Sequence, residues 1–505
     1  MKSLFRSITF LAVLVISLSS EAQEIKGRVL DAANKQPVAY ANVIFGDHRG
    51  VVTNEEGFFS FSTSEENTPA SIKISSLGYE LLEMDPKQIQ NEVVYLVPAT
   101  IELKEVFVSD KKLSPKEILR KAKEEISNNY DLNYSKKRIF FRQSDFNYVR
   151  KFGLHVEEST IPGIDQELMD RISAEVPKVS DSYKEVLADL YGNYDSQKLQ
   201  IIKAANLHNP QSTQTLTDLT DRLKTLFKQN LKKKSYLKIR SGILGVKVSA
   251  EELQEELAES KNEEKKEKTP EELEKEYADS QKNLQKNTSN KISSLLGNMF
   301  WKEDATFDLF DRINRYRYNM DGYAYIDNAT VYVISFEPRW RSDFKGKIYI
   351  NTADYGVHRL EYENVKPLSK FRLFGISALD DVYRGRLIFV KNDAGKYQLS
   401  YMEREKGESV GIDRPLTIIE KNKYVPGRRK QNELDLDLDF QMSQVERVQV
   451  VVYEQEDLQP MVYETLPQAT DFTYEKFRVY NPEFWKGNNI IEPNAAIKKF
   501  TAMQE

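Results

Sequence analysis

Apolar and polar residues alternate with a period of two over the first stretch after the N-terminus, from Glu24 to Ser109. This alternation is typical of strands that bury one side of a sheet, because successive side chains point to opposite faces. Turn-forming residues separate the strand-like segments, which read EIKGRVLD, AYANVIFG, GFFSFS, ASIKISSLGYE and EVVYLVP. Short strands at this spacing predict a β-sandwich, which we place at residues 23–109.

A helical pattern follows the predicted sandwich. Ser114 is a favourable N-cap, Pro115 suits the first helical position, and Glu117 completes a capping box. The apolar residues behind this cap recur at helical spacing and are Ile118, Leu119, Ala122 and Ile126. The sequence therefore predicts a helix that begins at Ser114.

The segment 110–249 is expected to mix helices and strands. We expect one long strand at 136–159 and three further helices at 181–192, 196–207 and 215–231. Residues 250–295 are rich in Glu, Lys, Gln, Ser and Asn, and contain too few apolar residues to bury much surface. We expect this segment to be a charged insertion, either helical with a break near Thr269 and Pro270 or disordered.

Period two returns in the last part of the chain, 296–505, and predicts consecutive antiparallel strands. The run from Asn392 to Gly395 is a strong hairpin signal. Near the end, Tyr480, Phe484 and Trp485 are expected to anchor the tail on this domain. The predicted fold class is α+β and mainly β: a sandwich, a helical segment, and a large antiparallel sheet that is expected to curve.

The N-terminus has the features of a signal peptide. Two basic residues precede a short apolar run, Ile8 to Leu18, and small residues follow before Gln23. We interpret residues 1–22 as a leader and expect the mature chain in the periplasm or at the outer membrane. The run is too short to span a bilayer, so no transmembrane span is expected once the leader is removed.

Composition narrows the chemistry further. The chain has no cysteine, which excludes disulfides, thiolate metal sites and an N-terminal cysteine for a lipid anchor. Its 73 basic and 78 acidic residues are nearly balanced. Because such a balance provides no basic field for a phosphate backbone, nucleic acid is not an expected partner.

The predicted sandwich resembles the carboxypeptidase regulatory-like domain, a prealbumin-like sandwich of seven strands that is common at the front of Bacteroidetes cell-envelope proteins. The residues that carry this resemblance are Gly27, Val29, Pro37, Val38, Ala41, Asn42, Val43, Thr53, Asn54, Gly57, Phe59, Leu103, Glu105, Val106 and Val108. Of these, Val38, Ala41, Val43 and Phe59 are also plausible core positions, and Gly57 suits a turn with positive φ. The resemblance covers about a sixth of the chain and names a module rather than an activity.

The remainder resembles the second domain that Bacteroidetes envelope proteins of unknown function place after the same module. The segments that carry this likeness are SPKEILRKAKEEISNNY, YLKIRSGILG and NPEFWKGNNII. The strand rhythm is also similar to that of periplasmic lipoprotein-carrier proteins, in which a curved sheet wraps an apolar cavity. A curved sheet with a filled core is the alternative.

The best candidate for catalysis is the pair His155 and Glu158, which has the spacing of the first two ligands of a zinc carboxypeptidase. A third ligand would have to come from a histidine such as His208 or His358. This chain differs from zinc carboxypeptidases in two ways. Their strands are parallel, whereas antiparallel strands are predicted here, and their sandwich follows the catalytic domain, whereas the predicted sandwich here comes first. In a strand the odd separation of the pair would also point the two side chains to opposite faces. We therefore predict no catalytic residue, no metal and no cofactor, with His155 and Glu158 as the sole candidates.

An aromatic-rich zone spans residues 316–349. On one face of a sheet such residues usually pack in the core, whereas exposed aromatic side chains would form a surface for sugars or apolar ligands. The residues that would form this ligand surface are Tyr318, Tyr325, Tyr332, Phe336 and Trp340.

Three functions remain open from the sequence. The favoured hypothesis is a non-enzymatic, exported envelope protein, with the sandwich as a docking module and the second domain as a scaffold or ligand-binding domain. The alternatives are a hydrolase that acts on peptide or glycan, and a carrier that holds an apolar ligand in a curved-sheet cavity. The corresponding partners are an envelope protein, a glycan or an apolar ligand.

Overall fold

The computed structural model describes most of the chain between Gln23 and Phe500. The residues outside this description are 1–22, 47–48, 64–68, 90–92, 100–112, 210–220, 223–224, 227–228, 233, 243, 250–268, 340, 423, 425, 427–428, 468–471 and 501–505. No helix in the described part is both long and apolar enough to cross a membrane.

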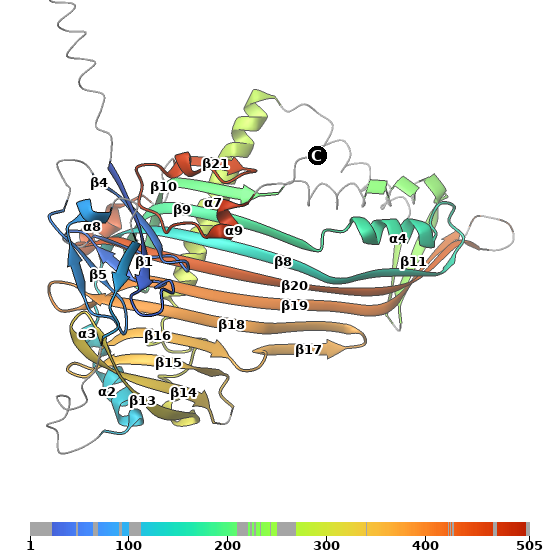
Figure 1. The fold of residues 1–505 in the computed structure, drawn as a ribbon. Helices are drawn as coiled ribbons and strands as arrows, with labels where there is room; N and C mark the ends of the chain where they lie inside the picture. The colour runs from blue at the N-terminus through green and yellow to red at the C-terminus, as the bar shows by residue number, and fades with distance from the viewer. Residues whose placement is uncertain are drawn as a thin grey trace, which may run out of the picture.

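The N-terminal part is a sandwich of two small sheets (Figure 1). One sheet has the order β4-β1-β7, from β1 (Gln23–Asp31), β4 (Phe58–Thr63) and β7 (Val93–Leu96). The other has the order β3-β2-β5-β6, from β2 (Asn42–Ile44), β3 (Gly50–Val52), β5 (Ile72–Ser75) and β6 (Leu82–Met84). The predicted core positions Val38, Ala41, Val43 and Phe59 are all buried, and Gly57 has a φ of 81°. The seven-stranded sandwich is therefore confirmed.

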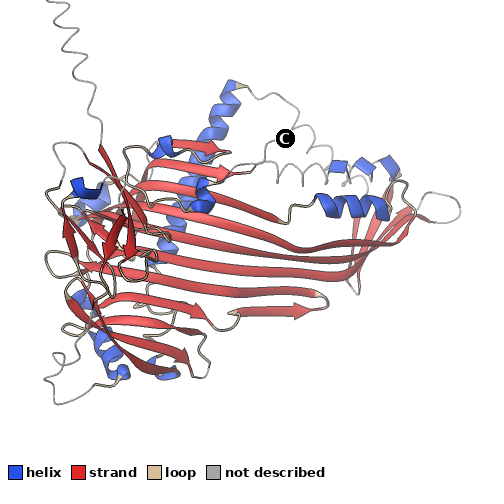
Figure 2. Cartoon of the chain, viewed as in Figure 1, coloured by secondary structure: helices blue, strands red, loops and turns tan. Residues whose placement is uncertain are grey.

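One 14-stranded sheet forms most of the remaining chain (Figure 2). Its main path is β13-β14-β15-β16-β18-β19-β20-β8-β9-β10-β21, and β11, β12 and β17 attach beside it. The bounds are β8 (Ser135–Ser159), β9 (Val179–Gly192), β10 (Gln197–His208), β11 (Ser235–Ser241), β12 (Leu244–Ser249), β13 (Tyr316–Ile326), β14 (Ala329–Pro338), β15 (Phe344–Asn351), β16 (Val357–Asn364), β17 (Ser369–Leu373), β18 (Ile376–Lys391), β19 (Tyr397–Asn422), β20 (Lys430–Asp457) and β21 (Thr473–Phe477). The pairs are antiparallel as predicted, apart from β10 and β21, which are parallel.

Three of these strands are very long. The strand β20 has 28 residues, which corresponds to about 90 Å at about 3.3 Å per residue, and β8 and β19 run alongside it. Figure 1 shows these strands leaving the region of the sandwich and continuing well beyond it. We call the part beside the sandwich the near half. The far half comprises residues 409–422 of β19, residues 430–442 of β20 and the strands paired with them.

Helices cover parts of this sheet. They are α2 (Pro115–Glu124), α3 (Ile126–Asn129), α4 (Gln166–Glu175), α7 (Pro270–Leu296), α8 (Pro460–Thr465) and α9 (Ala495–Lys498), with short 3-10 turns η2 (Pro86–Ile89), η3 (Ile313–Arg315) and η4 (Pro482–Trp485). The helix α2 begins with the predicted capping box of Ser114 and Glu117. Thr269 caps α7, so the second half of the charged segment is a single helix whose last turns are buried in the core.

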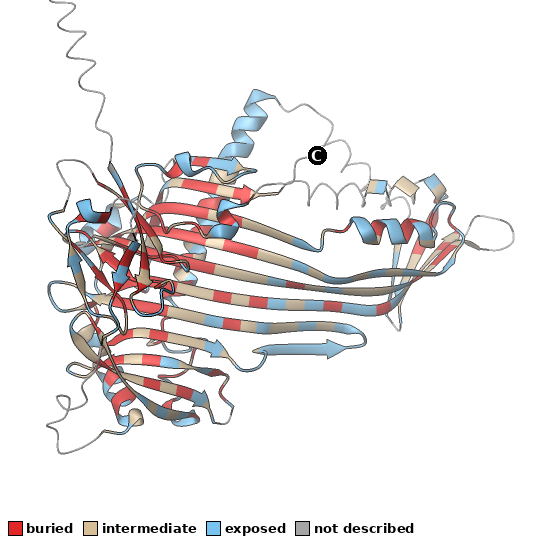
Figure 3. Cartoon of the chain, viewed as in Figure 1, coloured by how far each residue is buried: buried red, intermediate tan, exposed pale blue. Residues whose placement is uncertain are grey.

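The near half is covered on both faces. On the sandwich face, the N-terminal sandwich and the C-terminal tail share one core with Phe140 and Tyr401 of the sheet. On the helix face, α2 and α7 share a second core with Phe141 and Met402. Among the described residues, the far half has a small core in which α4 covers Leu434 and Leu436. Figure 3 shows the result, because the long strands change from mostly buried to mostly intermediate or exposed along their length.

Two predicted helices are wrong. Residues 181–192 lie in β9, and all of residues 196–207 except Ser196 lie in β10. The strand β9 is buried on both faces, with Val186 and Ala188 in one core and Leu187 in the other. Two-sided burial removes the alternation by which a strand is recognised, so the sequence looks like a buried helix. The third expected helix, 215–231, falls largely outside the described residues.

The C-terminal tail is anchored as predicted. Phe484 and Trp485 are buried, and the indole Nε1 of Trp485 donates a hydrogen bond of 2.8 Å to Glu185. Further along the tail, the Glu492 carboxylate accepts a hydrogen bond of 2.5 Å from Ser60 of the sandwich. The tail therefore ties the sandwich to the sheet.

Candidate functional site

The helix face of the long strands carries three zones in succession. The strands β19 and β20 pair without irregularity from Tyr401 to Glu420, so alternate side chains stay on one face over this length. In β20 these side chains are apolar near α7 (Val450 and Val448), polar in the middle (Glu446 and Gln444), and apolar again in the far half (Met442, Phe440, Leu438, Leu436 and Leu434). In β19 the same order runs from Met402 through Arg404, Lys406 and Glu408 to Val410, Ile412, Leu416 and Ile418. The exception is Arg414, a buried side chain on this face between Ile412 and Leu416, which donates to the backbone carbonyl of Ser241. A polar zone thus separates the main core from a second apolar zone.

The polar zone forms a cleft between α7 and the sheet, with a volume of about 700 Å³. Four cationic and two acidic side chains line it: Lys184, Lys291, Arg404 and Lys406, with Glu408 and Glu446. The Nη2 atom of Arg404 lies 3.7 Å from the Glu446 carboxylate, to which Lys291 also donates. The hydrogen bond from Lys406 to Glu408 raises the pKa of Lys406.

One donor in this cleft has no acceptor. The Nε–H of Arg404 is buried and has no hydrogen-bond partner among the described residues. A buried donor without a partner is costly, because it has lost its water and gained nothing in exchange. The cleft therefore has more positive than negative groups and an unused N–H on a cation.

Beyond the cleft, the apolar zone is only partly covered. The helix α4 packs on the β8 and β20 side, where it buries Leu434 and Leu436. On the side of β17, β18 and β19, apolar side chains remain exposed by 37–51%: Phe371, Leu373, Ile376, Val410 and Ile412. We call these five residues the distal apolar face.

The strand register places the members of the distal apolar face together. Phe371 lies opposite Ala378, which in turn lies opposite Val410. In the next row, Leu373 lies opposite Ile376, and Ile376 lies opposite Ile412. Side chains opposite each other in neighbouring strands share a face and contact one another. The exposed residues therefore form one contiguous patch rather than scattered single side chains, which are common on protein surfaces.

The other face of the far half is polar, and it carries the pair predicted as zinc ligands. His155 lies opposite Asp437, and Glu158 lies opposite Asp435. The register shifts between them, because Glu157 is an extra residue in β8. The bulge places His155 and Glu158 on the same face, so the expectation of opposite faces was wrong.

These residues are nevertheless not arranged as a metal site. The Nε2 atom of His155 lies 3.6 Å from Glu157, and His208 and His358 lie on the distant strands β10 and β16. Across the described part of the chain, no three His, Asp or Glu side chains are grouped so that they could hold a metal ion. His48 is outside the described residues.

The aromatic zone contributes to the core on the helix face. Phe336 is 1% exposed, and Tyr318 and Tyr332 pack against the same core. The register of β13 and β14 places Tyr325 on this side as well, while Trp340 is outside the described residues. Phe336, Tyr318 and Tyr332 therefore pack as parts of an ordinary core.

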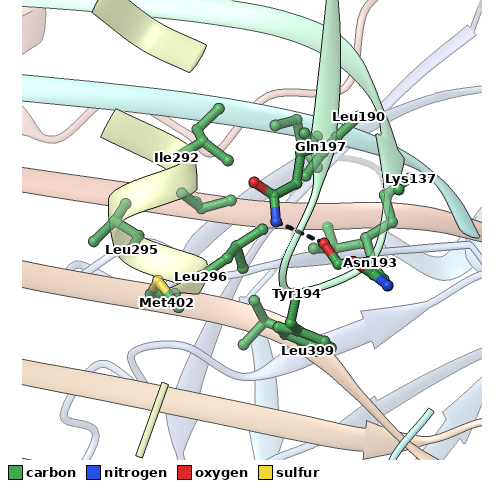
Figure 4. A pocket seen from close by; sticks show the side chains of 14 residues that line it. Lys137, Leu190, Asn193, Tyr194, Gln197, Ile292, Leu295, Leu296, Leu399 and Met402 are labelled. Carbon is green, nitrogen blue, oxygen red and sulfur yellow. Dashed lines mark hydrogen bonds between the residues drawn. The ribbon is translucent and has the colours of Figure 1, made fainter. Parts of the chain in front are cut away.

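A small cavity lies in another part of this core, between α7 and the strands β8, β9, β19 and β20. The cavity between α7 and the sheet has a volume of about 20 Å³, enough for about one water molecule. Figure 4 shows the side chains that surround it, among them Ile292 and Leu295 of α7 and Met402 of β19. Burial lowers the pKa of Lys137, at the rim of this cavity, to about 8. A space of this size does not hold an apolar ligand.

Comparison with known proteins identifies the sandwich but not the sheet. Residues 25–108 match the family model of the CarboxypepD_reg-like domain, which confirms the predicted resemblance for this part of the chain. No curated protein matches the chain at a significant level. The matched segment ends before α2, so the cleft and the distal apolar face lie outside it.

Proposed function

We propose that this chain, whose residues 25–108 form a CarboxypepD_reg-like domain, is an exported, non-catalytic envelope protein that binds an apolar ligand on its far half. The sandwich and the tail brace the near half, and the far half presents the distal apolar face. The observation that supports this function most strongly is the contiguous exposed patch of five apolar side chains. Exposed patches of this kind typically mark binding surfaces.

This proposal changes the predicted location of the ligand. The aromatic residues Tyr318, Tyr332 and Phe336 pack in the near half, whereas Val410 and Ile412 lie on the open far half. The sandwich is not free to dock elsewhere with the surface that it uses here. Its Glu55 pairs with Arg447 of the sheet, and Asn42 accepts a hydrogen bond from Ser400.

Binding of Nile red, a neutral apolar dye, tests the proposed function. We expect saturable binding by the native chain and a loss of at least fivefold in the double variant Val410→Ser/Ile412→Ser, because polar side chains would interrupt the patch. The matched control is Lys151→Ser/Asp439→Ser, which changes two exposed residues on the opposite face and should bind the dye normally. Equal binding by all three proteins would refute the proposal.

The hydrolase alternative has a separate test. The protein purified without chelator is expected to contain no stoichiometric zinc. Stoichiometric zinc that disappears in His155→Ala would instead support a metal-dependent hydrolase.

A further inference from the structure

The polar cleft and the distal apolar face adjoin each other on the same strands. In β19, Lys406 and Glu408 line the cleft, and Val410 follows them on the same face. A polar site that opens directly onto an apolar strip matches a molecule with a polar head group and a hydrocarbon chain. Neither zone alone would select such a molecule.

The extent of the distal apolar face suits part of a lipid chain. On β19 the open apolar part ends after Ile412, because Arg414 follows on this face. Across the sheet it continues through β18 to Phe371 and Leu373 of β17, about 10 Å away at about 4.8 Å per strand. One leaflet of a bilayer is about 15 Å thick in its hydrocarbon part, half of about 30 Å. The distal apolar face can therefore cover much of an extended acyl chain that crosses β19, β18 and β17.

The charges in the cleft select the head group. Four cationic side chains and two carboxylates line it, and Lys184 is also paired with Asp145 at 3.8 Å, so one cation is left in excess. The buried Nε–H of Arg404 has no acceptor among the described residues. Phosphate oxygens are strong acceptors for a guanidinium group, which can donate two N–H groups to them at once. A neutral sugar head group carries no negative charge, so it would leave the excess cation in the cleft without a counter-ion.

We infer that the cleft and the distal apolar face together bind a single anionic lipid, with its phosphate head group at Arg404 and its acyl chain along Val410 and Ile412. This inference deepens the proposed function and rests on it, because it names the class of apolar ligand. The second occupant to consider is another copy of this chain, since every residue of the edge strand β17 is exposed. A membrane surface is the third.

The experiment measures binding of three probes below their micelle concentrations: dodecyl phosphate, dodecyl maltoside and inorganic phosphate. The native chain is expected to bind dodecyl phosphate at least tenfold more tightly than dodecyl maltoside, which has the same chain and a neutral head group. Inorganic phosphate alone should bind too weakly to compete, because it gains nothing from the apolar strip. Similar affinities for the two dodecyl probes would overturn the inference.

Two variants separate the head group from the chain. In Arg404→Gln, the affinities for dodecyl phosphate and dodecyl maltoside should come within about threefold of each other, because the guanidinium donors are lost. In Val410→Ser/Ile412→Ser, both affinities should fall about equally, by at least fivefold. Lys406→Gln changes a side chain that is 42% exposed, so it tests the head group even if Arg404→Gln does not fold. The matched control is Lys151→Gln, a cation on the opposite face, which should leave both affinities unchanged.

The outcomes distinguish this inference from the proposed function. If Nile red binds to the distal apolar face but the head group makes no difference, the inference fails and the proposed function stands. If neither the dye nor the dodecyl probes bind, both fail. A dimer in sedimentation equilibrium that dissociates in Val410→Ser/Ile412→Ser would assign the face to self-association, and binding to intact anionic vesicles without binding of monomeric dodecyl phosphate would assign it to a membrane surface. Either result would overturn the inference.

Discussion

The near and far halves of the long strands share the same alternation of residues but differ in what covers them. In the near half, Met402 and Tyr401 of β19 are adjacent in sequence and are both buried, one in each core. In the far half, Ile412 and Asp413 are also adjacent, yet both are exposed. The comparison shows that the pattern of a strand determines which side chains share a face, whereas the helices and loops packed on that face determine whether it is closed.

The two halves should respond very differently to loss of an aromatic side chain. Phe389→Ala in the near half removes a fully buried ring and should cost about 3–5 kcal/mol of unfolding free energy. Phe371→Ala in the far half removes a ring that is 48% exposed and should cost less than about 1 kcal/mol. Urea unfolding of both variants measures the difference, and equal losses would show that the far half is closed.

Ion pairs should show the same contrast. Glu185 accepts from Arg142 at 2.7 Å, and both side chains are at most 2% exposed. Glu185→Ala leaves the Arg142 charge buried and unpaired, which should cost about 3–5 kcal/mol. Asp439→Ala breaks an exposed pair with Lys151 in the far half and should cost less than about 1 kcal/mol. Similar urea midpoints for the two variants would contradict a buried ion pair of Glu185 and Arg142 beneath the tail.

A pH dependence is expected from the near half. Burial lowers the pKa of His358 to about 4, compared with about 6.5 in the unfolded chain. The unfolded chain therefore takes up a proton that the folded chain does not, and stability falls as the pH decreases from about 6.5 to about 4. The loss should reach about 3 kcal/mol at pH 4. Urea unfolding across this pH range measures the effect. The free energy of unfolding should depend less steeply on pH in His358→Gln than in the native chain, and an unchanged pH dependence would exclude His358 as the source.

The smallest effect concerns the helix that covers part of the far half. Asp165 caps α4 by accepting a hydrogen bond of 2.9 Å from the backbone N–H of Leu168. Asp165→Ala should weaken α4 by about 1 kcal/mol, with faster hydrogen exchange confined to residues 166–175. Nile red binding should increase, because Leu434 and Leu436 beneath α4 would join the exposed patch. Ser114→Ala, which removes the cap of α2 in the near half, is the control and should leave dye binding unchanged.

Much of the fold was predictable from local patterns. The capping box at Ser114, the turn from Asn392 to Gly395 and the alternation of the sandwich each fix a local structure through residues close in sequence. Prediction failed for β9 and β10, because both strands are buried on both faces and no longer alternate. Their apolar runs are equally compatible with a buried helix.

The candidate site was visible only in part. The segment ELDLDLDF in β20 alternates strictly, so the presence of an apolar face could be predicted. The exposure of this face could not be predicted, because it depends on how α4 and other segments distant in sequence pack on the sheet. The aromatic zone was the candidate ligand surface instead, because a segment rich in Tyr and Phe is as typical of a ligand surface as of a large core. The unpartnered Nε–H of Arg404 depends on three-dimensional neighbours and has no counterpart in the sequence.

A pair of fluorescent labels on neighbouring residues tests the openness of the distal apolar face most directly. The chain has no cysteine, so Ile412→Cys and Asp413→Cys each provide one site for a polarity-sensitive dye, on opposite faces of β19. Both labels should be quenched by iodide in the free protein, and dodecyl phosphate should shift the emission of the label at 412 to the blue while leaving the label at 413 unchanged. A label at 412 that is already shielded from iodide, or equal shifts at both positions, would contradict an open apolar face that binds a lipid.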